Sequence, residues 1–163
     1  MAPQAMDASA GPAARAIALY WGVVLAWMAL ISLMSTEPFS ASNTHRYLDP
    51  ILRYLFPQIT AAEFAFWHFI IRKSAHFVEF FVLGLLAYWA SRRGRSPRWR
   101  AVWMLEALAL AVLYSLVDEL HQLFVPNRTP SWYDSSIDSL GASASQVIIW
   151  LRHRVLNRIA ALR

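Results

Sequence analysis

The stretch that decides the fold, residues 118–145, reads DELHQLFVPNRTPSWYDSSIDSLGASAS. It overlaps the ends of two apolar runs, residues 101–121 and 134–151, and each run is about long enough to cross ~30 Å of hydrocarbon as a helix. Between the runs, the segment VPNRTP combines two prolines with an asparagine, a composition typical of turns. The stretch therefore predicts a helical hairpin. Carboxylates and a histidine lie at the ends of its two helices and an arginine lies in the connection, at the level where lipid would begin.

The composition of the whole chain is that of a membrane protein. Of 163 residues, 58% are hydrophobic and only 15% are charged, and the mean hydropathy is +0.37, all unlike a soluble domain of this size. The net charge of +5 does not indicate a nucleic-acid partner, because the arginines adjoin apolar runs and form no recognition motif. The chain has no cysteine, which excludes a disulfide framework, a thiolate metal site and a cysteine nucleophile.

Two further apolar runs, residues 17–34 and 74–91, complete a set of four candidate membrane-spanning helices. The long connection between these two runs is too polar to span a membrane, and its stretch YLDPILRYLF is typical of an interfacial helix. Thr60 and Glu63 have the spacing of a capping box, which predicts a helix that begins there and continues into the second span. The expected fold is an all-α integral membrane bundle with about four transmembrane helices and an outer interfacial segment.

The positive charges predict how this bundle is oriented. The loop RRGRSPRWR and the tail RHRVLNRIAALR fall on the same side of a four-span array, and the positive-inside rule makes that side cytoplasmic. We therefore expect a multi-pass protein of the bacterial cell membrane with both termini in the cytoplasm. Residues 1–15 are expected to be disordered, residues 16–151 to form the transmembrane domain, and residues 152–163 to form a basic tail. The arginines that carry this prediction are Arg92, Arg93, Arg95, Arg98, Arg100, Arg152, Arg154, Arg158 and Arg163.

Three of the expected spans bring ionisable residues to one level. Counted from the cytoplasmic arginines at 1.5 Å per residue, His76, Asp118 and Asp134 lie about 24 to 27 Å from the inner boundary. Glu79 and Asp138 lie deeper, at about 20 Å, where an unpaired carboxylate in hydrocarbon is costly. We therefore expect Glu79 and Asp138 to face one another inside the bundle.

The spacing within each helix places these residues on shared faces. Lys73, His76 and Glu79 step by three along the second span, and Asp118 and Gln122 are four apart on the third. The fourth span carries a stripe of acidic and small residues, and small residues permit close helix packing. That stripe consists of Asp134, Asp138, Gly141 and Ser145.

Two segments, RKSAHFVEFFVLG and DELHQLFVPNRTPSWYDSSIDSLGA, resemble the VanZ-like family of small multi-pass membrane proteins. That family is named for a member associated with resistance to the glycopeptide antibiotic teicoplanin, so the resemblance implies a role in the cell envelope. Where the family commonly has glycine before its arginine this chain has Asn127, a residue that also tolerates a left-handed turn. The family also often has a glycine or another small residue near Ser145. The family pattern falls here on Lys73, His76, Asp118, Glu119, Gln122, Arg128, Asp134, Asp138 and Gly141.

In the first of three interpretations, the polar cluster binds the head group of an anionic membrane lipid or of a lipid-linked envelope precursor. Lys73 and Arg128 would contact phosphate, while carboxylates orient the other polar groups of the ligand. The ligand-binding residues are then Lys73, Gln122, Arg128, Asp134 and Asp138.

In the second interpretation, the protein is an enzyme that hydrolyses or transfers such a lipid. A buried Glu79 or Asp118 would be the general base and His76 its acid or base partner, while Arg128 would stabilise developing negative charge. The sequence has no G-x-S-x-G nucleophile motif and no H-E-x-x-H metal motif, so we expect neither a metal site nor a cofactor. The catalytic residues of this interpretation are His76, Glu79, Asp118 and Glu119.

In the third interpretation, the polar cluster only holds helices together, within a homo-oligomer or a larger envelope complex. Lys73 would then be a residue that extends toward the membrane edge, and His76 a packing histidine. The carboxylates would pair with Lys73 and Arg128 to lock the helices. The choice between binding, catalysis and packing stays open at the level of sequence.

Overall fold

The computed structural model describes residues 12–92 and 100–162. Arg93, Arg95, Arg98 and Arg163, and residues 1–11 of the expected disordered segment, lie outside the described residues. All regular elements of the described part are helical, which confirms the all-α class. They are α1 (Pro12–Met34), the short 3₁₀ helix η1 (Glu37–Phe39), α2 (Ala41–Leu55), α3 (Ala61–Arg92), α4 (Ala101–Gln122) and α5 (Trp132–Ala161).

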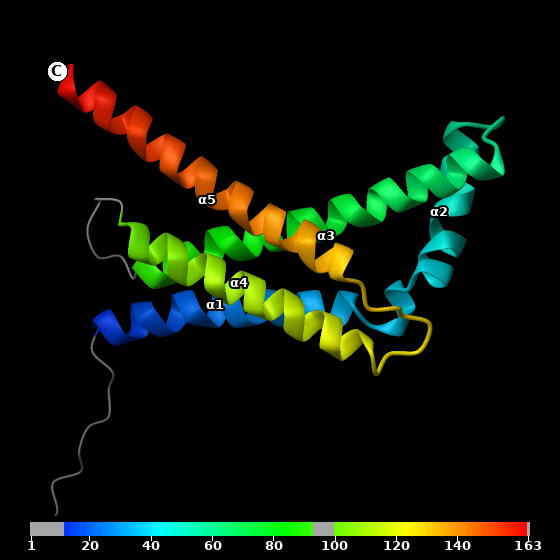
Figure 1. The fold of residues 1–163 in the computed structure, drawn as a ribbon, viewed down its shortest axis with the longest axis horizontal. Coiled ribbons are helices and arrows are strands. Elements are labelled where there is room, and N and C mark those ends of the chain that lie inside the picture. The colour runs from blue at the N-terminus through cyan, green and yellow to red at the C-terminus, as the bar shows by residue number, and fades with distance from the viewer. Residues whose placement is uncertain (1–11, 93–99, 163) are drawn as a thin grey trace, which may run out of the picture.

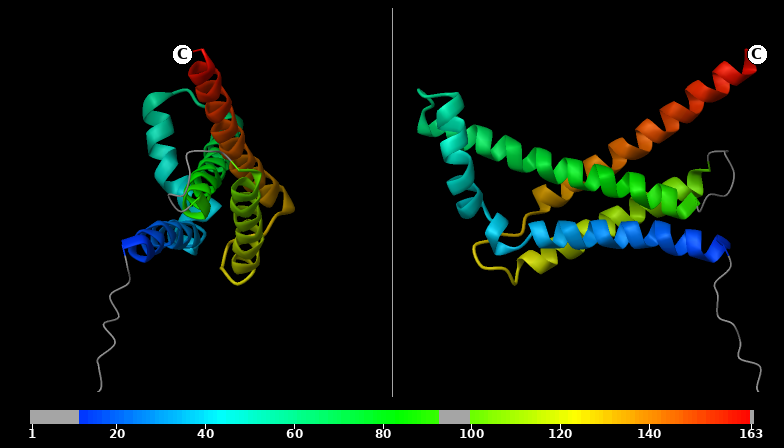
Figure 2. Two further views of the ribbon diagram at one scale, coloured as in Figure 1. Left: turned by 90° about the vertical axis from the view of Figure 1, so that its left-hand side faces the viewer. Right: turned by 180° about the vertical axis from the view of Figure 1, so that it is seen from behind.

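Four long helices lie lengthwise beside one another, and α3 contacts each of α1, α2, α4 and α5 (Figure 1). The first described turn of α1 and the last turn of α5 lie toward the same end of the bundle (Figure 1). At the opposite end, α2 folds back beside the first turns of α3, as both views in Figure 2 show. The chain therefore alternates in direction from one long helix to the next, as a hairpin array requires.

The predicted helix positions agree with the structure, but two helices are longer than their apolar runs. α3 begins at Ala61, as the capping box predicts, whereas α5 continues to Ala161, well past the predicted end of its span at residue 151. The predicted capping box is confirmed: the Thr60 amide donates to Glu63 Oε2 at 2.9 Å, and the Glu63 amide donates to Thr60 Oγ1 at 3.3 Å. Helix α3 is longer than its span because this cap starts it more than two turns earlier.

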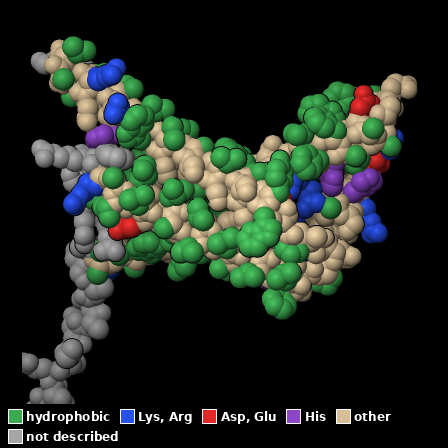
Figure 3. All heavy atoms as spheres, viewed as in Figure 1, with side chains coloured by type: hydrophobic (Ala, Val, Ile, Leu, Met, Phe, Trp, Pro, Cys, Tyr) green, Lys and Arg blue, Asp and Glu red, His purple; other side chains and the backbone are tan. Residues whose placement is uncertain are grey.

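Two helices of the described part, Ala14–Met34 within α1 and Ala101–Gln122, are long and apolar enough to cross a membrane. The other two long helices do not meet this criterion, and both carry ionisable side chains that lower their hydropathy. On the visible face, hydrophobic side chains cover the middle of the bundle and charged side chains lie toward its ends (Figure 3). Large apolar side chains remain exposed on the long helices, for example Leu19, Leu25, Leu113 and Leu120. An exposed apolar surface of this kind is suited to contact with lipid.

The closest helix packing joins α3 to α5. A Cβ atom added to Gly141 would lie 2.3 Å from the Phe77 carbonyl oxygen, so no larger residue fits there without moving a backbone. One turn along, Gln146 Nε2 donates to the Gly84 carbonyl at 2.9 Å. The predicted stripe of small residues on α5 is therefore a packing surface against α3.

Gly141→Ala is expected to lower the free energy of unfolding by about 1 to 3 kcal/mol, because overpacking must push α3 and α5 apart. The matched control is Gly22→Ala in α1, where an added Cβ would meet nothing within 4 Å. Because glycine inside a helix is less stable than alanine by about 1 kcal/mol, the control should be neutral or more stable. Thermal unfolding in detergent measures both variants, and equal melting temperatures would contradict the close contact at Gly141.

Candidate functional site

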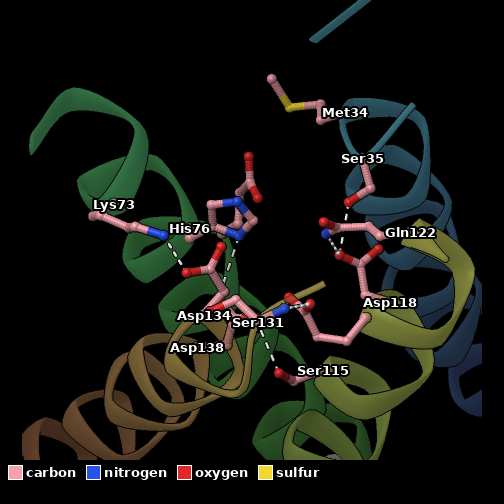
Figure 4. Close-up of polar contacts among 12 residues, drawn as sticks. Met34, Ser35, Lys73, His76, Ser115, Asp118, Gln122, Ser131, Asp134 and Asp138 are labelled. Atoms are coloured by element: carbon pink, nitrogen blue, oxygen red, sulfur yellow. Dashed lines mark hydrogen bonds and ion pairs between the residues drawn. The ribbon is translucent and has the colours of Figure 1, made fainter. Parts of the chain in front are cut away.

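The predicted polar residues converge where the ends of α1 and α4 meet α3 and the start of α5. In Figure 4 the labelled side chains from these helices extend toward one another, and dashed lines join them in small groups. Within the described residues, eight of the nine predicted site residues make a side-chain hydrogen bond or ion pair in this region. They are Lys73, His76, Asp118, Glu119, Gln122, Arg128, Asp134 and Asp138.

Lys73 on α3 forms an ion pair with Asp134 at the start of α5 (Figure 4). Its ammonium group also lies 5.4 Å from the ring centre of Phe69 and 5.5 Å from that of Tyr133, which adds cation–π attraction. The lysine is therefore turned toward α5, and its charge is balanced within the protein.

One turn further along α3, His76 approaches Asp138. His76 Nδ1 and Asp138 Oδ1 lie 3.4 Å apart, and Ser115 Oγ on α4 donates to Asp138 Oδ2 at 2.9 Å. Asp138 is fully buried, and His76 is 9% exposed. A single carboxylate therefore joins three helices, α3, α4 and α5.

A second carboxylate, Asp118 on α4, joins α4 to α1. Its Oδ2 atom accepts one hydrogen bond from Ser35 Oγ at 2.7 Å and another from Gln122 Nε2 at 3.0 Å (Figure 4). Asp118 is only 1% exposed, so these donors replace water around it. The predicted pair Asp118 and Gln122 is thus a direct contact, and Ser35 completes it.

Glu119 connects α4 to the start of α5. Its Oε2 atom accepts a hydrogen bond of 2.6 Å from the backbone amide of Ser131, the residue immediately before α5. This carboxylate thereby takes one of the amides that a helix N-terminus leaves without an intrahelical partner. Glu119 fixes the hairpin that the sequence predicts between α4 and α5.

Arg128 lies in the turn between these helices, next to Asn127. Asn127 has φ 59°, so the predicted left-handed turn is present at the position where the family commonly has glycine. Arg128 Nη2 donates to the carbonyl of Met34 at 2.7 Å and to that of Phe39 at 3.0 Å. These bonds satisfy carbonyls at and just beyond the end of α1, so the guanidinium ties the turn to the α1–η1 connection.

The electrostatic surroundings of Arg128 include a second arginine. Burial lowers the pKa of Arg128 from its ordinary value, and the nearby charge of Arg72 lowers it further. The carboxylates of Asp118, Glu79 and Asp134 act in the opposite direction. Two arginines therefore repel one another beside a group of carboxylates.

Glu79, predicted to face Asp138, lies near it, since the charges of His76, Asp138 and Asp118 all act on the Glu79 carboxyl group. In the described part of the chain no hydrogen bond joins its carboxylate to Asp138, which is instead held by His76 and Ser115. The backbone carbonyl of Glu79 accepts a hydrogen bond of 2.9 Å from Trp27 Nε1 of α1. Glu79 thus lies on the part of α3 that contacts α1.

Sequence reasoning missed three contributors to this site: Ser35, Ser115 and Arg72. Ser115 has a readable signal, because it lies three residues before Asp118 and is a hydroxyl within an apolar run. Ser35 has a weaker signal as the first polar residue after the first apolar run. Arg72 directly precedes Lys73, but only the fold brings it near Arg128.

Several buried polar atoms of the site make no hydrogen bond within the described residues. Three are carboxylate oxygens, which only accept hydrogen bonds when ionised. No group of three or more potential metal-binding side chains is close enough together in the described residues to hold a metal ion. The unpartnered atoms include Asp118 Oδ1, Glu119 Oε1, Asp138 Oδ1, His76 Nδ1 and Arg128 Nε.

Ser115→Ala is expected to destabilise the protein by about 1 to 3 kcal/mol, because it removes a donor from a buried carboxylate. Ser139→Ala on α5 is the control, since the Ser139 side chain makes no hydrogen bond within the described part of the chain. Chemical unfolding in detergent should show the loss for Ser115→Ala alone. A loss of the same size in both variants would contradict the assignment of Ser115 as a donor to Asp138.

Comparison with known families gives one match. The family model described as VanZ/LLP1 matches residues 20–153, a range that includes every residue of the site. The comparisons with curated proteins and with solved structures found no match.

Proposed function

Because the chain belongs to the VanZ/LLP1 family, we propose that it is a multi-pass cell-envelope membrane protein whose polar site binds a lipid head group. The family and the two apolar helices indicate a membrane protein. The ligand proposed is an anionic lipid or a lipid-linked envelope precursor, and a role in teicoplanin resistance is part of this proposal. The observation that supports it is a group of buried carboxylate oxygens that make no hydrogen bond within the described residues, near Arg72 and Arg128.

The proposed membrane arrangement has four spans. α3 and α5 lie lengthwise against α1 and α4, and their ionisable side chains are turned toward one another. A charged residue inside a membrane is tolerated in this position because its partner replaces water. With Arg92, Arg100 and Arg152 at the cytoplasmic boundary, the polar site lies at the outer leaflet, and both termini are cytoplasmic.

The chemistry of the site selects the kind of head group. Asp118 and Glu119 each have one buried oxygen that makes no hydrogen bond within the described residues, and Asp138 Oδ1 is approached only by His76 Nδ1, at 3.4 Å. A head group with hydroxyl or ammonium groups would supply donors to these oxygens. The carboxylates therefore favour a polyol, a sugar or an amine rather than a bare phosphate.

The two arginines favour a phosphate in the same ligand. Arg72 and Arg128 repel one another, and an anion bound between them would relieve that repulsion. Guanidinium groups bind phosphate oxygens with well-defined geometry, and their positive charge is never lost at neutral pH. The proposed ligand is thus a phosphate flanked by hydrogen-bond donors.

Acid–base catalysis on such a lipid is the second candidate, favoured by the His76–Asp138 contact. Ser115 is not arranged as a nucleophile, because its hydroxyl donates to Asp138 rather than to His76. A catalytic triad needs the serine hydroxyl on the histidine. Any catalysis would therefore use His76 and a carboxylate to move protons to or from bound substrate.

Asp118→Asn is expected to weaken lipid binding about tenfold or more, since a hydrogen bond to a charged group contributes about 1.5 to 3 kcal/mol. The side chains are nearly the same size, so the melting temperature should change little. The measurement is native mass spectrometry of protein released from nanodiscs of its own membrane, with the retained lipid mass as readout.

The control for this experiment is Asp49→Asn on α2, which alters an exposed carboxylate paired with Arg53 at 2.9 Å. It should retain lipid like the unaltered protein. Equal retention by both variants would rule out the polar site as the binding site. Unfolding of the Asp118 variant alone would instead support the helix-packing interpretation.

The proposed orientation predicts a labelling pattern in a protein that lacks cysteine. A cysteine in place of Thr129, in the α4–α5 turn, should react with an impermeant thiol reagent on whole cells. A cysteine in place of Arg158, near the end of α5, should react only after lysis. The reverse pattern would invert the orientation, and labelling of both positions on intact cells would contradict an odd number of spans between them.

A further inference from the structure

Helices α3 and α5 separate toward the end of the bundle that is remote from the polar site. Figure 1 shows α5 leaving the other long helices in this direction. The divergence opens a groove of about 670 Å³. Its walls are apolar and include Leu86, Ile149 and Leu156, while Arg92 and Arg152 also line it.

The groove is long enough for part of one hydrocarbon chain. The part of α3 that lines it runs from Leu85 to Arg92, a rise of about 10 Å along the helix. The lining passes along this length from leucines to an arginine. A ligand that fits must therefore be apolar over most of its length and anionic at one end.

The charges around the arginine end point to a lipid as this ligand. Next to the groove, the Arg154 guanidinium lies 4.3 Å from the ring centre of Trp150. Trp89, half exposed, lines the groove itself. Arginines and tryptophans at one level are typical of a membrane interface, and arginines there attract anionic lipids.

We propose that this groove holds an acyl chain of an anionic glycerophospholipid, with the lipid phosphate beside Arg92 and Arg152. With the membrane orientation proposed above, the lipid belongs to the inner leaflet. This site is separate from the polar site, since none of the nine predicted site residues lines the groove. The bound acyl chain fills the space between α3 and α5 where the two helices separate, past their close contact at Gly141.

The test is native mass spectrometry of the full chain from nanodiscs of equal parts phosphatidylglycerol and phosphatidylcholine. In protein that also carries Asp118→Asn to weaken the polar site, one phosphatidylglycerol should be retained in preference to phosphatidylcholine. Arg152→Gln should reduce that retention about fivefold, since a basic residue near an anionic surface contributes about that factor. Leu156→Trp should also reduce it, because the larger side chain fills the groove.

Arg158→Gln is the matched control. Arg158 is an exposed arginine of the same helix that does not line the groove, so its removal changes net charge equally without touching the site. Retention that falls equally in Arg152→Gln and Arg158→Gln would overturn the proposal, as would an absence of preference for the anionic lipid. A doubled protein mass without lipid would assign the groove to a second copy of the chain.

The polar-site variant Asp118→Asn separates this proposal from the proposed function. It should retain phosphatidylglycerol at the groove whatever it does to binding at the polar site. Loss of groove lipid in Asp118→Asn with an unchanged melting temperature would overturn the independence of the two sites. A melting curve for each variant identifies any that loses lipid by unfolding.

Discussion

Burial of Asp118 and Asp138 is the constraint on which the rest of the structure depends. Both carboxylates are almost completely inaccessible, and an ionised carboxylate without donors is far too costly in such surroundings. The donors come from neighbouring helices: Ser35 of α1 for Asp118, and Ser115 of α4 for Asp138. Each carboxylate therefore fixes how two or more helices approach one another, and the hydrogen bonds act together with apolar packing.

The packing of α3 on α5 in turn sets the geometry of the site. Gly141 allows the Phe77 backbone to approach within a distance that no side chain would permit. Asp138 lies one turn before Gly141, and His76 directly precedes Phe77, so the His76–Asp138 distance of 3.4 Å depends on this contact. A glycine that makes no polar side-chain contact thus determines whether the side chains of His76 and Asp138 can meet.

The sequence could predict the helices, most residues of the polar cluster and the Asp118–Gln122 contact within one helix, but not most of the contacts between helices. Period-three spacing correctly put Lys73 and His76 on one face of α3, and Asn127 marked a left-handed turn. Which acceptor each donor reaches depends on how the helices are rotated about their axes. In this rotation the contacts of Asp138 are with His76 and Ser115.

Contacts between side chains and backbone carbonyls were also not predictable. Carbonyls at a helix end have no residue-type signature, so the contacts of Arg128 with the carbonyls of Met34 and Phe39 could not be predicted. The start of a helix was predictable where a cap exists, as at Thr60. The length of the apolar run did not predict the end of α5. That helix continues to Ala161 through residues too polar to count as a span.

The two roles assigned to Arg128 are compatible because of the shape of its side chain. Guanidinium has five N–H donors in a rigid plane, and the bonds to Met34 and Phe39 both come from Nη2. Its buried Nε makes no hydrogen bond within the described residues, so a donor remains after α1 has been anchored. A lysine has a single ammonium group. It could not hold both carbonyls and at the same time direct a donor toward a phosphate. Anchoring of α1 and the proposed ligand contact together require arginine at this position, and neither alone would exclude lysine.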